Sequence, residues 1–390
     1  MLLNATFSKK FGHSPAFIAR APGRVNLLGE HVDYNDGPVL PAALDLEVRL
    51  AFAPAENGLI SLHALDLGER VTFDRSSIQE KKDWRGQPLP NWALYPAGVA
   101  WSLLEAGYAA PGMQAAYTSN IPIGSGLSSS AAVEVAFAVA WQALGGWKAD
   151  RMEIARLCQR AENAYVGVAS GLMDQFASAH GVEGKALYFD TRSLEWQTVP
   201  LPPGTALVIA DSRARRNLTT SAYNDRRASC EQAVELLRKY KPELRSLRDI
   251  STIELAAYLE YLPDETGKRA EHVVREIARV HSAVRALELE ETRSFGALMY
   301  AGHASLRDLY EVSTPELDAL IETARGLNSC IGARLTGAGF GGCTVNLVEE
   351  SQAEKFIHDL KIGYHTKTGR EAVVYLCKAS AGASVSKTRG

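Results

Sequence analysis

A segment of small residues between a strand-like and a helix-like stretch constrains the fold of this chain most strongly. Residues 122–132 (PIGSGLSSSAA) follow a strand-like run from Met113 to Ile121 and lead into an apolar, helix-like run from Ala131 to Leu144. The first turn of a helix has unpaired backbone N–H groups at the positive end of the helix dipole, which favours an anion such as phosphate. The pattern therefore predicts a phosphate-binding loop, with a plain strand-to-helix turn capped by serine as the alternative.

The residues of this loop suit close contact with phosphate. Gly124 and Gly126 allow the backbone to approach without a Cβ in the way, and the serine hydroxyls can bond phosphate or a metal ion. No lysine follows the glycines, so the segment is not the G-x-x-x-x-G-K-[ST] loop of the common nucleotide hydrolases. The candidate phosphate loop comprises Gly124, Ser125, Gly126, Leu127, Ser128, Ser129 and Ser130.

Composition argues against several other classes of protein. The chain has 390 residues, enough for two domains, and its net charge of −3 is unlike that of basic nucleic-acid or membrane-surface proteins. No apolar run approaches the roughly 20 residues that cross a bilayer, and the first residues do not resemble a secretory signal. Five scattered cysteines without C-x-x-C spacing predict reduced thiols, not a disulfide or zinc framework. We therefore expect a cytoplasmic protein with no nucleic-acid, membrane or obligate protein partner.

Strand and helix signals alternate irregularly, which favours an α+β fold with helices packed on a sheet in each half. The stretch from Ser193 to Gly204 is the best candidate for a domain junction, because its prolines disfavour both helix and central strand. The predicted strands are Val39–Phe52, Met113–Ile121, Lys185–Asp190, Ala206–Ala210, Cys343–Val348 and Ala372–Leu376. The predicted helices are Trp92–Ala106, Ala131–Leu144, Arg151–Tyr165, Glu316–Leu327 and Ser351–Leu360.

The richest polar cluster, residues 20–37 (RAPGRVNLLGEHVDYNDG), shows neither helical nor strand periodicity and is expected to be a loop. Loops carry functional residues disproportionately. Within it, Glu30, His31 and Asp33 supply acceptors and a switchable donor, a set that can hold several hydroxyls of a sugar. A solvated loop with turn-forming Asn, Asp and Gly is the alternative.

Two further clusters carry candidate polar groups. Glu162 lies near the end of the helix predicted from Arg151, where a glutamate is usually at the surface. Asp174, in residues 170–175 (SGLMDQ), lies in an apolar neighbourhood where an unpaired carboxylate is costly, so we expect it to be paired or functional. Residues 335–343 (LTGAGFGGC) contain four glycines before a predicted strand, which indicates an unusual backbone path or a Gly-rich bulge.

The order of these motifs resembles the galactokinase branch of the GHMP kinases, the family named for galacto-, homoserine, mevalonate and phosphomevalonate kinases. The motifs are RAPGRVNLLGEHVDYN at 20–35, the serine loop, GLMDQ at 171–175, YNDRR at 223–227 and LTGAGFGGC at 335–343. The resemblance extends from about residue 17 to about residue 346. The first motif is specific to the galactokinase branch, whereas the serine loop and the last motif mark the wider family.

The resemblance implies an α+β fold of two domains, residues 1–199 and 200–390. The N-terminal domain is expected to contain a left-handed β-α-β crossover, the sugar site and the phosphate loop. The C-terminal domain is expected to be ferredoxin-like, with the active site in the cleft between the domains. The implied activity is that of an ATP-dependent sugar 1-kinase, which transfers the γ-phosphoryl group of ATP to the C1 hydroxyl of galactose.

By the same resemblance, Asp174 corresponds to the catalytic base and Arg24 to the cation beside it. Arg24 is expected to keep Asp174 ionised, so that it accepts the proton late in a loose transition state. The phosphates of ATP are expected on the serine loop, with Mg²⁺ held by Ser130 and Glu162, because a hydroxyl and a carboxylate suit that ion. The last Gly-rich motif is expected near the site without a ligand contact. The positions that match galactose contacts are Glu30, His31, Asp33, Gly171 and Tyr223.

One departure from the family pattern bears on the sugar. Galactokinases usually have Glu-His-Thr-Asp where this chain has Glu30-His31-Val32-Asp33. Members of the branch that act on N-acetylgalactosamine or arabinose also vary here, so a kinase for such a related sugar is one alternative. An inert sensor that binds galactose and ATP is another, although its serine loop is expected to be damaged, and here the loop is intact.

Overall fold

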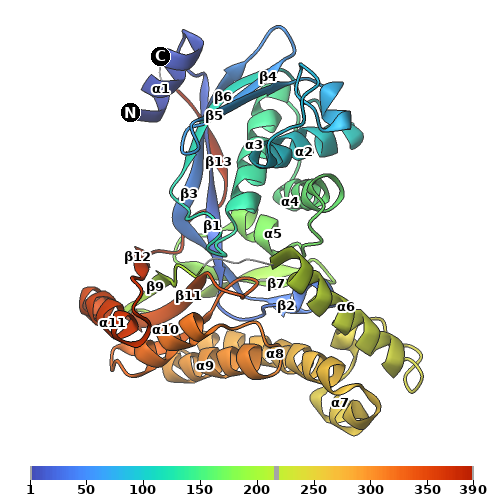
Figure 1. Cartoon of the computed structure of the whole chain (residues 1–390), viewed down its shortest axis with the longest axis vertical. Coiled ribbons are helices and arrows are strands. Elements are labelled where there is room, and N and C mark those ends of the chain that lie inside the picture. Colours follow the sequence, from blue (N-terminus) through green and yellow to red (C-terminus); the bar gives the residue numbers. More distant parts are fainter. Residues whose placement is uncertain (1, 215–218, 389–390) are drawn as a thin grey trace.

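The computed structural model describes residues 2–214 and 219–388, and its elements form two groups, one above the other in Figure 1. The upper group comes mainly from the first half of the chain and the lower group from the second half. Two long strands, β1 (Phe17–Asn26) and β3 (Pro41–Pro54), run from the upper group down to the lower one. The arrangement confirms the predicted α+β class, with helices packed on a sheet in each half.

The upper group contains a six-stranded sheet. Besides β1 and β3, its strands are β4 (Ile60–Ala64), β5 (Glu69–Phe73), β6 (Met113–Ser119) and β13 (Ser384–Lys387). The helices of the upper group are α1 (Leu2–Phe11), η2 (Ser77–Glu80), α2 (Asn91–Glu105), α3 (Ser129–Gly145), α4 (Arg151–Arg160), η3 (Ala161–Val166) and α5 (Met173–His180). The strand order is β13-β1-β3-β6-β4-β5, with β4 parallel to β6 and the other neighbours antiparallel. Helices α2 to α5 cover one face, and Phe7 of α1 packs on the other face against Ala51 and Ala116.

A three-stranded sheet, in the order β2-β7-β8, is formed by β2 (Pro38–Val39), β7 (Lys185–Asp190) and β8 (Trp196–Pro200). β8 lies in the proline-rich stretch that was expected to be a domain junction. It is an edge strand, which is where proline is tolerated in a sheet. The boundary between residues 199 and 200 stays a prediction, and β13, near the end of the chain, pairs with β1 in the upper sheet.

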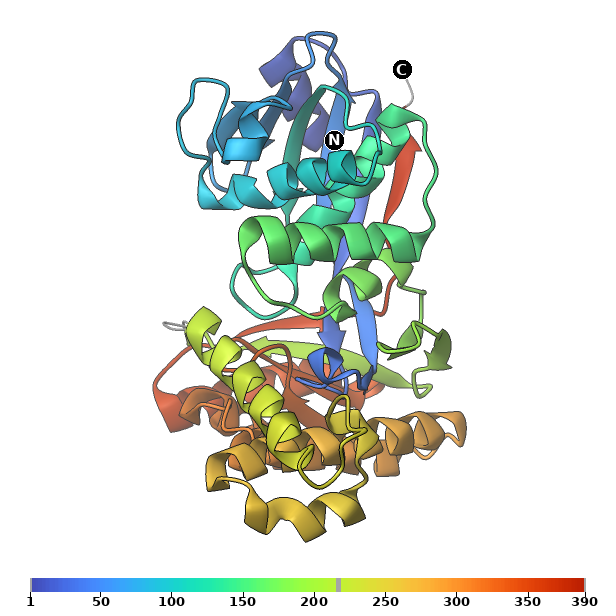
Figure 2. The same cartoon turned by 90° about the vertical axis from the view of Figure 1, so that its right-hand side faces the viewer.

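The lower group is an antiparallel four-stranded sheet with helices packed against it. Its strands are β9 (Thr205–Asp211), β10 (Cys330–Leu335), β11 (Cys343–Glu349) and β12 (Val373–Cys377), in the order β10-β11-β9-β12. Its helices are α6 (Thr219–Leu237), η4 (Leu247–Asp249), α7 (Thr252–Tyr258), η5 (Leu259–Tyr261), α8 (Asp264–Glu288), α9 (Thr292–Asp308), α10 (Pro315–Arg325), η6 (Glu350–Gln352) and α11 (Ala353–Thr368). Figure 2 shows α6 crossing in front of this layer, toward the upper group.

The predicted strands and helices are confirmed, with local differences. The strand expected over Val39–Phe52 is two strands, β2 and β3. The helix expected over Arg151–Tyr165 is α4 followed by the π-helical turn η3. The helix expected over Ser351–Leu360 begins with η6 and continues in α11 to Thr368.

The expectation that residues 20–37 form a loop is wrong for residues 20–26, which lie in β1. The pairing of β1 with β3 shifts its register between Pro22 and Arg24, and both faces of the strand are buried from Ala21 onward. A bulge and a strand buried on both faces hide the alternation of polar and apolar residues that identifies most strands.

The bulge also brings the serine loop against β1. The backbone N–H of Arg24 donates to the carbonyl oxygen of Leu127 at 3.1 Å. A Cβ at Gly23 would lie 2.6 Å from that same oxygen, so only glycine permits the approach. The motif on β1 and the serine loop, about a hundred residues apart in sequence, are therefore held together by backbone contact.

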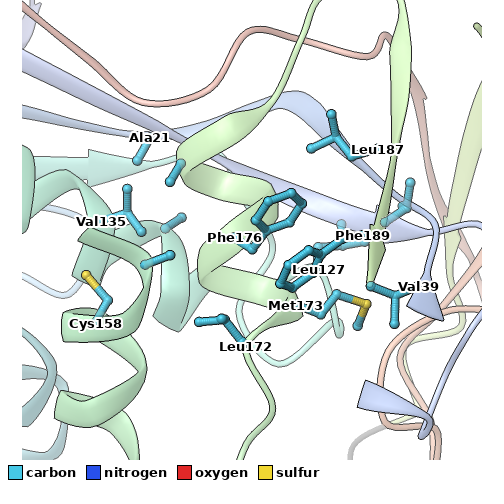
Figure 3. Close-up of a cluster of buried hydrophobic side chains, with 14 of the residues drawn as sticks. Ala21, Val39, Leu127, Val135, Cys158, Leu172, Met173, Phe176, Leu187 and Phe189 are labelled. Carbon is cyan, nitrogen blue, oxygen red and sulfur yellow. The ribbon is translucent and has the colours of Figure 1, made fainter. Parts of the chain in front are cut away.

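An apolar cluster below the loop anchors α5, as Figure 3 shows. Phe176 is fully buried and stacks on Phe189 of β7, with ring centroids 3.8 Å apart. Met173 and Leu127 belong to the same core cluster. Because these apolar side chains fix one face of α5, the orientation of Asp174 in its first turn is fixed as well.

A buried ionic network joins the two groups. Arg334 of β10 has no exposed surface and forms salt bridges with Glu30 and, at 2.8 Å, with Glu276 of α8. Arg279 also pairs with Glu276, and the backbone N–H of Gly29 donates to it at 2.8 Å. Burial alone would raise the pKa of Glu276, but Arg334 and Arg279 hold it below its usual range. The network fixes the turn after β1 against β10 and α8.

Each of the five cysteines, all within the described residues, lies outside any disulfide. Among the residues that the structure describes, no helix combines the length and hydropathy that spanning a bilayer requires.

We expect Arg334→Met to lower the free energy of unfolding by ~3–5 kcal/mol, because it leaves two buried carboxylates without their shared cation. Urea unfolding of the purified variant measures this. The control is Arg245→Met, since the side chain of Arg245 is 73% exposed and lies 3.8 Å from Asp249, and its loss should cost less than ~1 kcal/mol. Equal losses in the two variants would contradict the role given to the network.

Candidate active site

A cleft of about 580 Å³ is lined by residues of both groups. Its upper walls come from the end of β4 and the turn after it, the start of α2, β6, the serine loop with the start of α3, and the segment from η3 to the start of α5. The other walls come from β1 and the turn after it, α6, and the Gly-rich turn after β10. The structure brings the predicted catalytic, sugar and metal residues together here: Arg24, Glu30, His31, Asp33, Ser130, Glu162, Gly171, Asp174 and Tyr223.

Asp174 is paired, as expected from its apolar neighbourhood. The guanidinium of Arg24 donates from Nε to Oδ1 at 2.8 Å, with Nη2 at 2.6 Å from the same oxygen. The hydroxyl of Ser128 donates to Oδ2 at 2.5 Å. The side chain of Arg24 is 5% exposed and that of Asp174 is 27% exposed. A buried cation and a hydroxyl therefore hold the carboxylate at the wall of the cleft.

The serine loop divides between the cleft and the core. Ser125 turns away from the cleft, because its hydroxyl donates to the carbonyl of Pro122 at 2.7 Å, and Leu127 lies in the core. α3 begins at Ser129, so the unpaired N–H groups of its first turn lie beside the cleft. The predicted loop residues that line the cleft are Gly124, Gly126, Ser128, Ser129 and Ser130.

Glu162 is buried in η3, contrary to the usual surface position of a glutamate near a helix end. Its Oε2 accepts from the hydroxyl of Ser170 at 2.5 Å and from Nε2 of Gln175 at 2.8 Å. The hydroxyl of Ser130 lies near enough to this carboxylate to lower its pKa slightly. Burial raises the pKa of Glu162 despite these bonds, which marks a site where a cation would stabilise the charged form.

The donor set of Ser130 and Glu162 fits magnesium. Both offer hard oxygen ligands, and Mg²⁺ is usually held by one or two protein carboxylates together with phosphate oxygens and water. Among residues 2–214 and 219–388, no group of three His, Cys, Asp or Glu side chains gathers as a metal site. Bound phosphate and water would supply the other ligands of a cation held by Ser130 and Glu162.

Two carboxyl groups at the inner end of the cleft have raised pKa values. Burial raises the pKa of Glu30 to about 7, against the opposing effect of Arg334. Burial and then the charge of Asp174 raise the pKa of Asp33 to about 6. A Cβ at Gly171 would lie 1.8 Å from Oδ2 of Asp33, so only glycine fits beside this carboxyl. Such groups can donate or accept hydrogen bonds to a polyhydroxy ligand.

His31 is a neutral, oriented imidazole. Burial lowers its pKa to about 3. Its Nε2 lies 3.2 Å from the carbonyl oxygen of Ala338, which can only accept, so Nε2 carries the hydrogen. Nδ1 then accepts from the hydroxyl of Tyr34 at 2.8 Å. The ring of Tyr223 lies beside it, with centroids 5.5 Å apart. Both ring nitrogens have hydrogen-bond partners within the protein. His31 therefore contributes the shape of its ring to the pocket wall and has no free nitrogen for a ligand.

One part of the cleft wall is largely apolar, although Asp66 and Asn91 also line it, and the sequence did not point to it. The indole of Trp92 donates from Nε1 to Glu69 at 2.6 Å, which fixes the ring. A planar aromatic ligand fits such a lining. The feature of the sequence that could have indicated this lining is the pair Trp92 and Tyr95, which lie one turn apart at the start of α2. The side chains are Leu67, Trp92, Tyr95, Tyr117, Ile123 and Val133.

Three other polar residues were also missed. Gln175 follows Asp174 directly in its motif and is fully buried, and Glu134 of α3 is fully buried one turn beyond Ser130. Burial raises the pKa of Glu134 well above its usual range. Arg334 was missed because nothing in the sequence marks an arginine in a buried strand.

Comparison with known proteins gives a consistent assignment. The galactokinase galactose-binding signature matches residues 5–54, the GHMP kinase N-terminal domain residues 95–182 and the GHMP kinase C-terminal domain residues 283–366. A galactokinase of Roseiflexus sp. (strain RS-1) is 45% identical over 97% of this chain and 95% of its own. A human galactokinase is 41% identical over 97% and 94%. The crystal structure of Lactococcus lactis galactokinase complexed with galactose superposes with a TM-score of 0.92, at 34% identity and covering 98% of both chains.

We expect Asp33→Asn to alter how stability depends on pH. A folded-state pKa of about 6, above the ordinary 3.8, means that the protonated carboxyl stabilises the fold below about pH 4 and that this contribution is lost as pH rises to about 6. Asparagine cannot ionise, so the stability of the variant relative to the wild type should rise by roughly 1–2 kcal/mol over this range, because solvent at the partly exposed Asp33 screens part of the effect. Urea unfolding at several pH values measures the difference, and a constant difference would contradict the raised pKa.

Proposed function

The chain belongs to the galactokinase family, and we propose that its cleft transfers the γ-phosphoryl group of ATP to the C1 hydroxyl of galactose. One observation carries the proposal. Arg24 bonds Asp174 through Nε and bonds the carbonyl of Gly126 in the serine loop through Nη1, at 2.6 Å. A single guanidinium thus lies between a carboxylate beside the hydroxyl-binding end of the cleft and a loop suited to phosphate, which is where phosphoryl transfer to a sugar requires a cation.

In this proposal the inner end of the cleft holds the sugar. Glu30 and Asp33 bond its hydroxyls, Gly171 leaves room beside Asp33, and His31 and Tyr223 form the wall. The backbone N–H of Gly337 donates to Glu30 at 3.2 Å, which orients that carboxyl. Two carboxyls with raised pKa values recognise several hydroxyls without carrying two full charges into a buried site.

The phosphates lie on the serine loop and the start of α3, and the apolar end receives the nucleoside base. Gly124, Gly126, Ser128, Ser129 and Ser130 form the phosphate side of the cleft, with the backbones of Ser125 and Leu127 completing the loop. Ser130 and Glu162 hold Mg²⁺, which neutralises phosphate charge when bound. We infer a cytoplasmic location, because five free thiols fit a reducing compartment.

Asp174 and Arg24 act on the reacting atoms. The C1 oxygen attacks the γ-phosphorus in line, the bond from that phosphorus to the leaving oxygen of ADP breaks, and the proton of the C1 hydroxyl passes to Asp174. In a loose transition state the nucleophile needs little activation, so Asp174 accepts the proton late and mainly orients the hydroxyl. Arg24 stabilises the charge that develops on the transferred group.

Val32, which stands where galactokinases usually have threonine, does not line the cleft. Val32 is fully buried and belongs to the core, where its side chain lies against Gly37. The polar groups that face the cleft are therefore the same whether valine or threonine stands here. This favours galactose over a related sugar as the substrate.

We expect Asp174→Asn to retain the fold and to lower kcat by ~10²–10⁴, because asparagine cannot accept the proton or pair fully with Arg24. Steady-state kinetics measures kcat. Asp190→Asn is the matched control, since Asp190 pairs with Arg248 at 2.5 Å outside the cleft, and its kcat should stay within about twofold. A kcat for Asp174→Asn above about a tenth of the wild-type value would remove Asp174 from catalysis.

We also expect kcat/KM to favour galactose over glucose by as much as ~10⁴, since a misplaced C4 hydroxyl leaves buried polar groups unpaired. Asp33→Ala should erode this preference. Val32→Thr should change galactose kinetics by less than about tenfold, because residue 32 does not line the cleft, and the buried hydroxyl should lower stability instead. Comparable kcat/KM values for the two epimers would contradict galactose as the specific substrate and would support only a sugar kinase of the wider family.

A further inference from the structure

Glu134 is a buried carboxyl that the proposed reaction does not use. It lies on α3, has no exposed surface, and its Oε2 accepts from Nε2 of Gln175 at 2.9 Å. Within residues 2–214 and 219–388, no lysine, arginine or histidine forms a salt bridge with it. A buried carboxyl without a cation is costly. A hydrophobic side chain of similar size would pack here without that cost, so the carboxyl requires another explanation.

Gln175 links this carboxyl to Glu162. Its Nε2 donates to Oε2 of Glu134 at 2.9 Å and to Oε2 of Glu162 at 2.8 Å. An amide NH₂ has two hydrogens, so both are used and the amide has a fixed orientation. With the amide reversed, its oxygen could be satisfied only by a proton on Glu134 or Glu162, whereas the observed orientation gives each carboxyl one N–H donor. Glu134 therefore favours the orientation in which the NH₂ end of Gln175 faces Glu162.

The contact between Gln175 and Glu134 leaves buried polar atoms without hydrogen bonds. Oε1 of Gln175 and Oε1 of Glu134 are buried and have no hydrogen-bond partner among the described atoms. A buried polar atom without a partner destabilises a protein by roughly 1–3 kcal/mol in general. A retained cost of this kind fits a functional constraint better than a purely structural one.

We propose that Glu134 and Gln175 are positioning residues, which hold the Glu162 carboxylate in the orientation that binds the metal. This inference rests on the proposed role of Glu162 as a magnesium ligand. Oε2 of Glu162 is held by Gln175 and by Ser170 at 2.5 Å. Two donors at this one oxygen restrict rotation of the carboxylate. Groups that orient metal ligands in this way commonly affect metal affinity by 10–100-fold.

The test compares metal affinity among variants of the full chain. Glu134→Leu removes the acceptor while filling the space, and Glu134→Gln retains an acceptor oxygen at the same place. Val135→Ala is the control for a loosened helix, because Val135 is a buried core residue of α3. Glu162→Gln tests the metal ligand itself. Affinity of Mn²⁺ for the protein–ADP complex is measured by electron paramagnetic resonance, and galactose binding without metal by calorimetry.

We expect Glu134→Leu to weaken Mn²⁺ binding at least tenfold while galactose binding changes less than twofold. Glu134→Gln and Val135→Ala should both bind Mn²⁺ within about twofold of the wild type. If Glu134→Leu does not fold, Gln175→Met carries the same expectation.

Two outcomes separate this inference from the proposed metal site. Unchanged Mn²⁺ affinity in Glu162→Gln would overturn the metal site itself, and the inference with it. A tenfold loss in Glu162→Gln with no loss in Glu134→Leu would overturn the inference alone. Equal losses in Glu134→Leu and Val135→Ala would also overturn it, because they would reflect only a loosened helix.

Discussion

The guanidinium of Arg24 is the contact on which the cleft depends. It is almost fully buried, it donates to Asp174 of α5 and to the carbonyl of Gly126, and it comes from a bulged strand at the centre of the fold. Three segments that are far apart in the sequence meet at this one cation. A buried cation without acceptors is costly, so the fold that satisfies Arg24 also places Asp174 beside the serine loop.

A second buried arginine, Arg334, connects the lower group to the site. Arg334 of β10 bonds Glu30, and the Gly-rich turn that follows β10 donates to Glu30 and accepts from His31. The turn that carries the sugar-binding candidates is thus fixed from the lower group. Because the carboxyls lie at this contact, a change in the packing of the two groups would alter the site directly.

The sequence predicted the parts of the site that local motifs carry. The serine loop, Asp174 and the Glu30–Asp33 cluster each stand in a short motif with a chemical reason. What it could not predict depends on contacts between distant residues. The bulge at Gly23 hid a strand, and the helix pattern alone favoured a surface position for Glu162, which only the family resemblance placed at the site. Gln175, Glu134 and Arg334 are meaningful only once α3, α5 and β10 are in place. The aromatic end of the cleft was missed for the same reason, since Trp92 and Tyr95 resemble ordinary core residues until the cleft is seen.

The central claim is transfer of the γ-phosphoryl group of ATP to C1 of galactose. Phosphorus NMR of the products, with ATP, Mg²⁺ and galactose labelled with ¹³C at C1, tests it most directly. The account predicts a phosphomonoester signal coupled to the labelled C1 carbon and to its hydrogen, formed in step with ADP. A phosphate coupled to another carbon, or inorganic phosphate released with ADP while the sugar stays unmodified, would contradict it.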